Sequence, residues 1–231
     1  MRRKSNNAPR NNVLRYLLWL LVAYTAFSNR QHYRMPTTWL PHLLTNTLSL
    51  LLPDALRGLF ASRHRPRNVV EDTLLTMVRD NPNYAIYVAP LALGYIVSHP
   101  RFNIYKGSWG ALRLAGFGLD SLPHSATAFA FSALVADTFE TMGTRQQYNG
   151  MLADFVRWGK HKPELLSLVM LGLVTINWEL GEYMMFQREI AEKGDAALTN
   201  MQWSMEDTWR DVGANLIGWT AAMLWHRSKQ K

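Results

Sequence analysis

The stretch of sequence that decides the fold is LLSLVMLGLVTINWELGEYMMF, residues 165–186. It is the longest of six apolar stretches, and a helix needs about 20 such residues to cross the hydrocarbon core of a bilayer. The pattern predicts an all-α, polytopic membrane bundle of about six transmembrane helices, forming one integral membrane domain over residues 1–231. The other five stretches, several of them shorter than an ideal span, are 13–27, 39–52, 84–97, 124–139 and 212–225.

The overall composition leaves a soluble helical protein open as an alternative. The chain is 48% hydrophobic and 18% charged, and short apolar runs can also be buried globular helices. The charges are clumped between the apolar stretches, however, and aromatic residues cluster at the ends of the stretches, as in the aromatic belts of membrane proteins. The chain contains no cysteine, which excludes disulfides and thiolate metal sites. The tryptophans at the ends are Trp19, Trp39, Trp109, Trp178, Trp219 and Trp225.

The net charge of +8 is distributed unevenly around the six stretches. With the N-terminus placed in the cytoplasm, each cytoplasmic segment carries at least three basic residues and each outer loop carries two; four further basic residues lie in or near the stretches. Basic residues concentrate on the cytoplasmic side of membrane proteins. The pattern therefore predicts that both termini are cytoplasmic, with residues 1–12 as a basic tail. No nucleic-acid motif accompanies the basic residues, so nucleic acid is not an expected partner.

Three sets of polar residues interrupt the apolar stretches, each with the three- or four-residue spacing that places side chains on one helical face. In the six-span topology all three sets fall at the non-cytoplasmic end, where we expect them to meet in one acidic pocket. Carboxylates held close together must share protons, bind a cation or meet basic groups. The sets are Asp120 with His124, Glu179 with Glu182, and Asp207 with Asp211 and Asn215.

The last set also has a structural interpretation. Ser204 precedes Asp207 by three residues, a spacing close to that of a capping box, so Asp207 could serve only to begin the last helix. Asp211 and Asn215 lie deeper in an apolar helix, where polar groups are costly. For these two residues the sequence favours a function or an interhelical polar lock.

The other two sets have structural alternatives as well. Asp120 could occupy a turn, and a single histidine such as His124 is more often a hydrogen-bonded structural residue than a ligand. Glu182 could form an interfacial ion pair with Arg188 or Lys193.

The order D-x-x-x-H, E-x-x-E and D-x-x-x-D-x-x-x-N-x-x-G, which here ends at Gly218, resembles that of the YjdF-like uncharacterised inner-membrane proteins of bacteria. More distantly it is similar to the VanZ-like family. The similarity covers residues 115–220, with departures at Pro123 and Ser125 around the histidine and at Glu182, where the VanZ-like pattern often has glutamine. The resemblance implies a multi-pass protein of the bacterial inner membrane. The association of VanZ-like proteins with glycopeptide resistance implies an envelope-facing role.

The leading hypothesis is a membrane protein whose acidic pocket binds a divalent metal ion or transfers protons, acting on envelope or lipid substrates. The first alternative is a non-enzymatic subunit or assembly factor, whose polar residues lock helices together and whose partners, besides the bilayer, are other membrane proteins or a second copy. The second alternative is a proton-coupled transporter, although no internal repeat supports it. Oxygen and nitrogen ligands suit hard or borderline cations, and the candidate ligands are Asp120, His124, Glu179, Glu182 and Asp211.

Overall fold

The six apolar stretches coincide with the six longest helices in the described part of the chain. The computed structural model describes residues 8–61, 66–114, 116–145, 148–196, 199 and 203–229, so most of the predicted basic tail lies outside it. Apart from a two-residue antiparallel ladder, the regular structure in these ranges is helical, which confirms the all-α prediction. The six helices are α1 (Ala8–Tyr33), α2 (Leu40–Leu59), α4 (Tyr84–Ile96), α6 (Ser121–Arg145), α8 (Pro163–Lys193) and α9 (Met205–Lys229).

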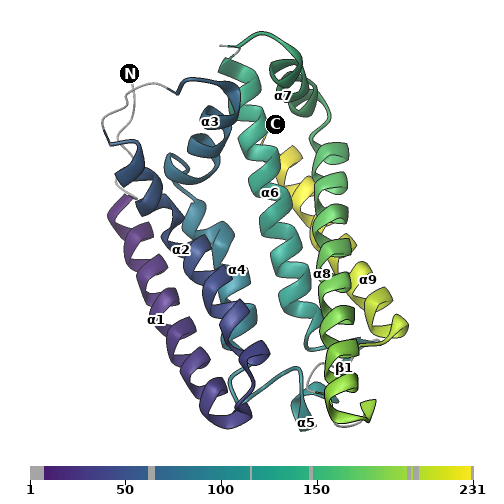
Figure 1. Cartoon of the computed structure of the whole chain (residues 1–231). Coiled ribbons are helices and arrows are strands. Elements are labelled where there is room, and N and C mark those ends of the chain that lie inside the picture. Colours follow the sequence, from purple (N-terminus) through teal and green to yellow (C-terminus); the bar gives the residue numbers. More distant parts are fainter. Residues whose placement is uncertain are drawn as a thin grey trace.

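Successive long helices run in opposite directions along the bundle, so the start of α1 and the end of α9 lie at the same end, named here the terminal end (Figure 1). Two shorter helices lie at this end (Figure 1): α3 (Val69–Leu74), which continues as the π-helical turn η2 (Leu75–Arg79), and α7 (Met151–His161). The opposite end, the hairpin end, holds α5 (Gly107–Gly110) and the ladder of β1 (Arg113–Leu114) with β2 (Phe117–Gly118). A single 3₁₀ turn, η1 (Pro36–Thr38), joins α1 to α2.

Helix α8 shows how local sequence sets the helix boundaries. Pro163 stands in the first turn, where its missing N–H group would be unpaired in any case, and Glu164 places negative charge at the positive end of the helix dipole. The helix ends at Gly194, which has a left-handed φ of 76° that glycine adopts without strain. These signals extend α8 beyond the apolar stretch at both ends.

Helix α6 is the centre of the C-terminal half and packs against α4, α7, α8 and α9, with its most extensive contact to α9. Small residues allow this close approach. Gly218 of α9 lies against the main chain of α6, and a Cβ atom at this position would overlap the carbonyl oxygen of Ser125. Next to this contact, Ala130, Ala133 and Ala222 are almost completely buried. Small residues at interhelical contacts are typical of membrane bundles.

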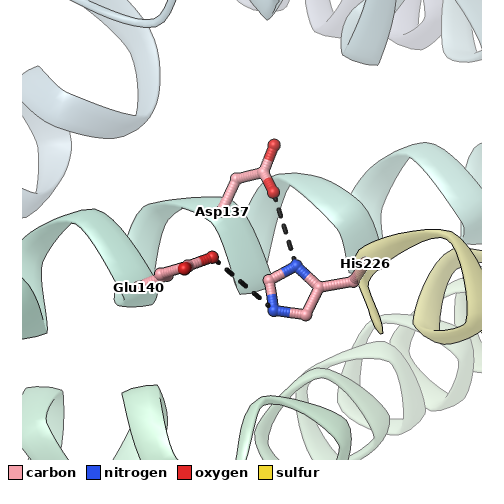
Figure 2. Close-up of side chains that lie close together, drawn as sticks. All are labelled: Asp137, Glu140 and His226. Carbon is pink, nitrogen blue, oxygen red and sulfur yellow. Dashed lines mark ion pairs between the residues drawn. The ribbon is translucent and has the colours of Figure 1, made fainter. Parts of the chain in front are cut away.

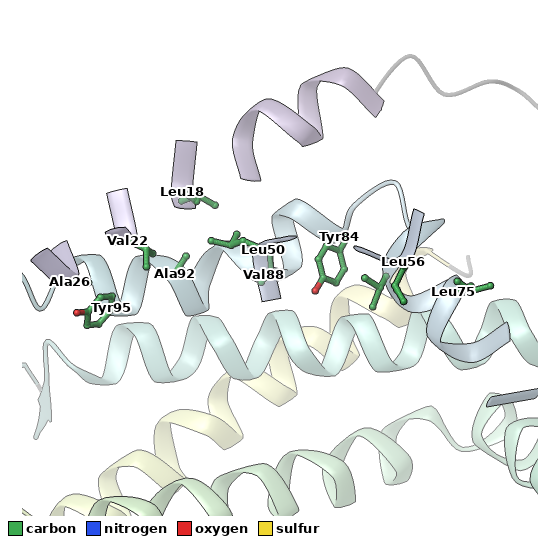
Figure 3. Close-up of a cluster of buried hydrophobic side chains, with 11 residues drawn as sticks. Leu18, Val22, Ala26, Leu50, Leu56, Leu75, Tyr84, Val88, Ala92 and Tyr95 are labelled. Carbon is green, nitrogen blue, oxygen red and sulfur yellow. The ribbon is translucent and has the colours of Figure 1, made fainter. Parts of the chain in front are cut away.

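Helices α1, α2 and α4 form a second packing unit with η2 (Figure 3). Its core contains Leu18 and Val22 from α1, Leu50 from α2, and Val88 and Ala92 from α4. An ion pair between buried Arg15 and partly exposed Asp54 crosses the same unit: the Arg15 guanidinium lies 2.8 Å from the Asp54 carboxylate and also donates to the Leu50 carbonyl. This unit supports α4, which in turn packs against α6.

The surface of the bundle is rich in apolar side chains, whereas several polar side chains are buried between helices. On α8, for example, Leu173 and Ile176 are more than half exposed, while Ser167 is fully buried. By length and hydropathy alone, α8 is the only helix within the described ranges that qualifies as a membrane span; α4 is apolar but shorter. The all-helical bundle is therefore established, and the six-span arrangement belongs to the proposal below.

Candidate functional site

The three polar sets lie at the hairpin end of the bundle because of the directions of their helices. Helix α8 descends to this end, so Glu179 and Glu182 fall in its later turns, whereas α6 and α9 begin there with His124 and Asp211 in their early turns (Figure 1). Each helix contributes its polar residues from one face. Residues that are far apart in the sequence are thereby brought to one place.

Three acids, Glu179, Glu182 and Asp211, are here named the acidic cluster. One carboxylate oxygen of each lies within 4.8 Å of the corresponding oxygens of the other two. Asp211 is only 5% exposed, and its Oδ2 lies 3.5 Å from Nε2 of His124. The two glutamates come from α8, the aspartate from α9 and the histidine from α6. Three helices therefore converge on one compact group of oxygen and nitrogen atoms.

Two residues outside the three predicted sets orient the glutamates. The Thr208 hydroxyl donates to Oε2 of Glu179 at 2.6 Å, and the Trp178 indole donates to Oε1 of Glu182 at 2.8 Å. The Trp178 contact has the i, i+4 spacing of neighbours on a helix, so the sequence contained a signal for it. The Thr208 contact joins α9 to α8 and has no local signal.

The remaining predicted residues lie at the edge of the acidic cluster or deeper in the bundle. The Ser204 hydroxyl accepts from the Asp207 amide at 3.1 Å and so caps the start of α9, while the Asp207 carboxylate lies 3.6 Å from Arg210. Asp120 accepts from the backbone amide that follows it at 2.9 Å. Asn215 donates to the Thr175 hydroxyl at 3.0 Å and makes an interhelical contact one turn below Asp211.

The acidic cluster carries more negative than positive charge. Within the described residues, His124 is the one basic side chain at ion-pair distance from its carboxylates. The ion pair of Glu182 with Arg188 or Lys193, one of the sequence alternatives, is not formed: Arg188 pairs with Glu192, and Lys193 lies 3.6 Å from Glu189. Like charges at this spacing repel one another strongly unless protons or a cation neutralise them.

Tyr105 lies in the loop between α4 and α5. Its hydroxyl donates to the carbonyl of Gly94 at 2.8 Å. Loss of water around the hydroxyl raises the pKa of Tyr105, and the negative charges of Asp120, Glu182 and Asp211 raise it further. The charges of the acidic cluster therefore act on a residue of this loop, which sequence analysis did not anticipate.

A second group of ionisable residues lies nearer the terminal end and was missed by sequence analysis. Asp137 and Glu140 of α6 flank His226 of α9, and we name these three residues the bridged cluster (Figure 2). His226 is 2% exposed; its Nδ1 lies 3.6 Å from Asp137 and its Nε2 lies 3.7 Å from Glu140. The D-x-x-E spacing of the two acids was the available signal, but it falls at the boundary of the fourth apolar stretch.

Two neighbouring groups contact Asp137 of the bridged cluster. The Tyr87 hydroxyl donates to Asp137, and the Lys229 ammonium lies 3.4 Å from the same carboxylate. Lys229 also lies 3.2 Å from the centre of the Trp225 ring. Helices α4, α6 and α9 are therefore joined by opposite charges and hydrogen bonds.

No protein-family model, curated protein or solved structure matches the chain. The resemblance of residues 115–220 to the YjdF-like and VanZ-like proteins therefore stays a hypothesis. The function has to be argued from the geometry and charge of the site itself.

Proposed function

We propose that the chain is a polytopic membrane protein that binds a divalent cation at the acidic cluster. The cation site is carried by one observation: three carboxylates from two helices lie within 4.8 Å of one another, with His124 as their one basic neighbour among the described residues. A divalent cation would neutralise this surplus and join α8 to α9. The His124–Asp211 pair, 3.5 Å apart, could additionally accept or donate a proton beside the bound ion.

The proposed spans are α1, α2, α4, α6, α8 and α9. Their mean hydropathy is lowered by polar side chains that are buried against neighbouring helices, such as Arg15 and Asn29, each 2% exposed. Their outward faces are apolar, with Leu17 and Leu20 of α1 more than half exposed. Polar residues inside and apolar residues outside are the arrangement expected in a bilayer, where intramembrane polar groups face the bundle interior.

The hairpin end is proposed to face away from the cytoplasm. Basic side chains such as Arg145, Arg157, Lys160 and Arg227 lie on helices that end or begin at the terminal end. Because basic residues favour the cytoplasmic side, the terminal end is placed there. The acidic cluster then opens toward the envelope in the proposed bacterial inner membrane.

The ligand chemistry favours a hard or borderline cation such as Mg²⁺ or Mn²⁺. Carboxylate oxygens with one imidazole suit these ions, whereas soft metals prefer the sulfur ligands that this chain lacks as cysteine. Thr208 and Trp178 already hold one oxygen of each glutamate, and such outer partners orient ligands and strengthen metal binding.

The cation site is tested by titrating detergent-purified protein with Mn²⁺ and measuring free Mn²⁺ by electron paramagnetic resonance. We expect Glu179→Gln and Asp211→Asn each to weaken binding by at least about tenfold. The matched control is Glu206→Gln, which removes a charge from an exposed position of α9. Wild-type affinity in both cluster variants, or no binding by folded wild-type protein, contradicts the proposal.

The topology is tested separately with single cysteines, because the natural chain has none. Glu206→Cys lies at the hairpin end and Lys162→Cys at the terminal end, and both positions are exposed. In intact cells, a membrane-impermeant maleimide should label the first and not the second. Recovery of the protein in the soluble fraction, or labelling of both cysteines in intact cells, refutes the proposed arrangement.

The bridged cluster gives some support to the alternative of a non-enzymatic membrane subunit. Its two carboxylates face His226, and Asp137 also contacts Lys229 and Tyr87, so it joins three helices as a structural lock would. This alternative predicts stable partner proteins that co-purify in mild detergent and no bound cation. The Mn²⁺ titration therefore discriminates between the two functions.

A further inference from the structure

Helix α7, at the terminal end of the bundle, packs closely against its neighbours with one face (Figure 1). Ala153, Val156 and Gly159 are buried on this face. A Cβ atom at Gly159 would overlap the ring of Phe139 on α6 and the side chain of Leu166 on α8. This close fit fixes which face of α7 is turned away from the bundle.

The outward face of α7 is also apolar. Met151 is 82% exposed, and Phe155 and Trp158 are each more than 40% exposed. Their spacing of four and three residues places them on one side of the helix, and we name them the α7 stripe. The Phe155 and Trp158 rings stack with their centres 5.8 Å apart. The helix has 11 residues, too few to cross a bilayer, and an exposed apolar stripe on such a helix is typical of helices that lie in the membrane interface.

Two lysines, Lys160 and Lys162, stand at the C-terminal end of α7. The nearest acids in the sequence have other partners: Asp154 forms an ion pair with an arginine of α7, and Glu164 lies 3.0 Å from an arginine of α9. Within the described residues, neither lysine lies at ion-pair distance from a carboxylate. The two ammonium groups are therefore available to an anionic partner.

We infer that α7 lies in the headgroup region of the cytoplasmic leaflet and binds anionic phospholipids. The α7 stripe contacts the acyl chains, and Lys160 and Lys162 contact the headgroups. This inference rests on the proposed membrane arrangement, which places the terminal end in the cytoplasm, but it involves neither the acidic cluster nor a metal ion.

The position of the lysines and their charge select this partner. Lys162 directly precedes α8, the helix that is long and apolar enough to span a membrane, so the two ammonium groups lie where the bilayer surface begins. Basic residues beside a span attract anionic lipids, and each raises the affinity about fivefold. A second copy of the chain that docked through the same helix would bring its own lysines to the contact, where like charges repel.

The first test measures lipid binding to full-length protein in a neutral detergent by native mass spectrometry. The probe is dioleoylphosphatidylglycerol, which is anionic. We expect dioleoylphosphatidylcholine, which has the same chains and no net charge, to bind at least about tenfold more weakly. Inorganic phosphate, which lacks the chains, should also bind at least about tenfold more weakly. Equal binding of either compound overturns the inference.

Replacing both lysines, Lys160→Gln with Lys162→Gln, should weaken binding of the anionic lipid about 25-fold. Glutamine keeps most of the aliphatic stem, which at position 160 packs on Gly143 of α6, so the fold is retained. The matched control is Arg101→Gln with Arg188→Gln, which removes two exposed positive charges at the hairpin end and should bind the lipid normally. An equal loss in the two double variants overturns the inference, because net charge alone would then account for binding.

The second test measures the depth of the α7 stripe in vesicles made of equal parts of the two lipids. Met151→Cys and His161→Cys each give a single cysteine for a nitroxide label, because the natural chain has none. Both positions are exposed, and they lie about a quarter of a turn apart around the helix. By electron paramagnetic resonance, the label at position 151 should be more accessible to oxygen and less accessible to a water-soluble nickel complex than the label at position 161. Equal or greater access of nickel at position 151 overturns the inference.

Failure of this inference can be told apart from failure of the proposed function. If maleimide labelling gives the proposed topology but α7 shows neither lipid selectivity nor insertion, only this inference fails. Recovery of the protein in the soluble fraction refutes the proposed spans and the lipid contact of α7 together.

Discussion

The acidic cluster and the bridged cluster are built from similar residues and share helix α9, but their carboxylates have different partners. The acidic cluster joins α8 to α9 and has His124 of α6 beside it, whereas the bridged cluster joins α6 to α9 and contains His226. In the bridged cluster, both ring nitrogens of His226 face a carboxylate, and Lys229 and Tyr87 add further partners to Asp137 (Figure 2). In the acidic cluster, His124 faces one carboxylate of three.

The difference indicates that residue type alone does not make a binding site. His226 lies between its two carboxylates, 3.6 Å from one and 3.7 Å from the other, and Lys229 lies 3.4 Å from Asp137. The acidic cluster keeps a surplus of negative charge in a partly buried place, which only protons or a cation can neutralise. In the proposed function, a bound cation would relieve the repulsion among the carboxylates of the acidic cluster.

The two clusters are separated by the close contact of α6 with α9, and breaking that contact should have the largest effect. Gly218→Ala forces a Cβ atom into the Ser125 carbonyl and should cost about 3 kcal/mol of unfolding free energy. The measurement is thermal or denaturant unfolding in detergent, followed by tryptophan fluorescence. Gly213→Ala on the same helix is the control: its Cβ would lie 3.6 Å from the Phe117 ring, and stability should change by less than about 1 kcal/mol. Equal stability of the two variants would contradict the packing described here.

The gain in unfolding free energy on adding a cation should distinguish the two clusters most directly. At a Mn²⁺ concentration about 100 times the dissociation constant, wild-type protein should gain about 2.7 kcal/mol of stability. Asp211→Asn should gain little, because a ligand is lost, and without cations it should be at least as stable as wild type, because one repelling charge is gone. The same unfolding assay, with and without Mn²⁺, checks both expectations. A large loss of stability in cation-free Asp211→Asn would show that this carboxylate is a structural lock.

Removing one charge from the bridged cluster should lower stability and leave Mn²⁺ binding unchanged, which is the opposite of the result expected for the acidic cluster. Asp137→Asn leaves buried His226 and partly exposed Lys229 without their shared carboxylate, which should cost about 2 kcal/mol. Mn²⁺ affinity should stay at the wild-type level. The control is Asp154→Asn on α7, where an exposed ion pair with Arg157 is worth less than about 1 kcal/mol. A loss of Mn²⁺ binding in Asp137→Asn would mean that the two clusters are coupled.

The smallest effect is expected at the cap of α9, which lies beside the acidic cluster without belonging to it. Ser204→Ala removes the acceptor of the Asp207 amide and should cost about 1 kcal/mol, with Mn²⁺ affinity unchanged. Ser204→Asp should retain the stability, because aspartate is an equally good cap. If Ser204→Ala instead abolished Mn²⁺ binding, the first turn of α9 would have to be counted as part of the cation site.

Much of the acidic cluster could be predicted because helical spacing is local. Glu179 with Glu182, and Asp211 with Asn215, share faces by periodicity alone, and alternation of six helices placed the three sets at one end. Periodicity does not say which neighbouring helix the polar face of a given helix contacts. Asn215 contacts Thr175 rather than the acidic cluster. Thr208 of α9 contacts Glu179 of α8, a contact between two helices that spacing along the chain does not predict.

The sequence by itself determined the six helices, their directions and the end of the bundle that carries the surplus acids, because hydropathy and spacing act along the chain. Only the tertiary structure decided which charges are compensated. His226 reaches Asp137 and Glu140, and Tyr87 reaches the same aspartate, through packing between residues that are distant in the sequence. The physical reason is that compensation depends on distances of a few ångströms between helices, which are set by close contacts such as that of Gly218 with Ser125.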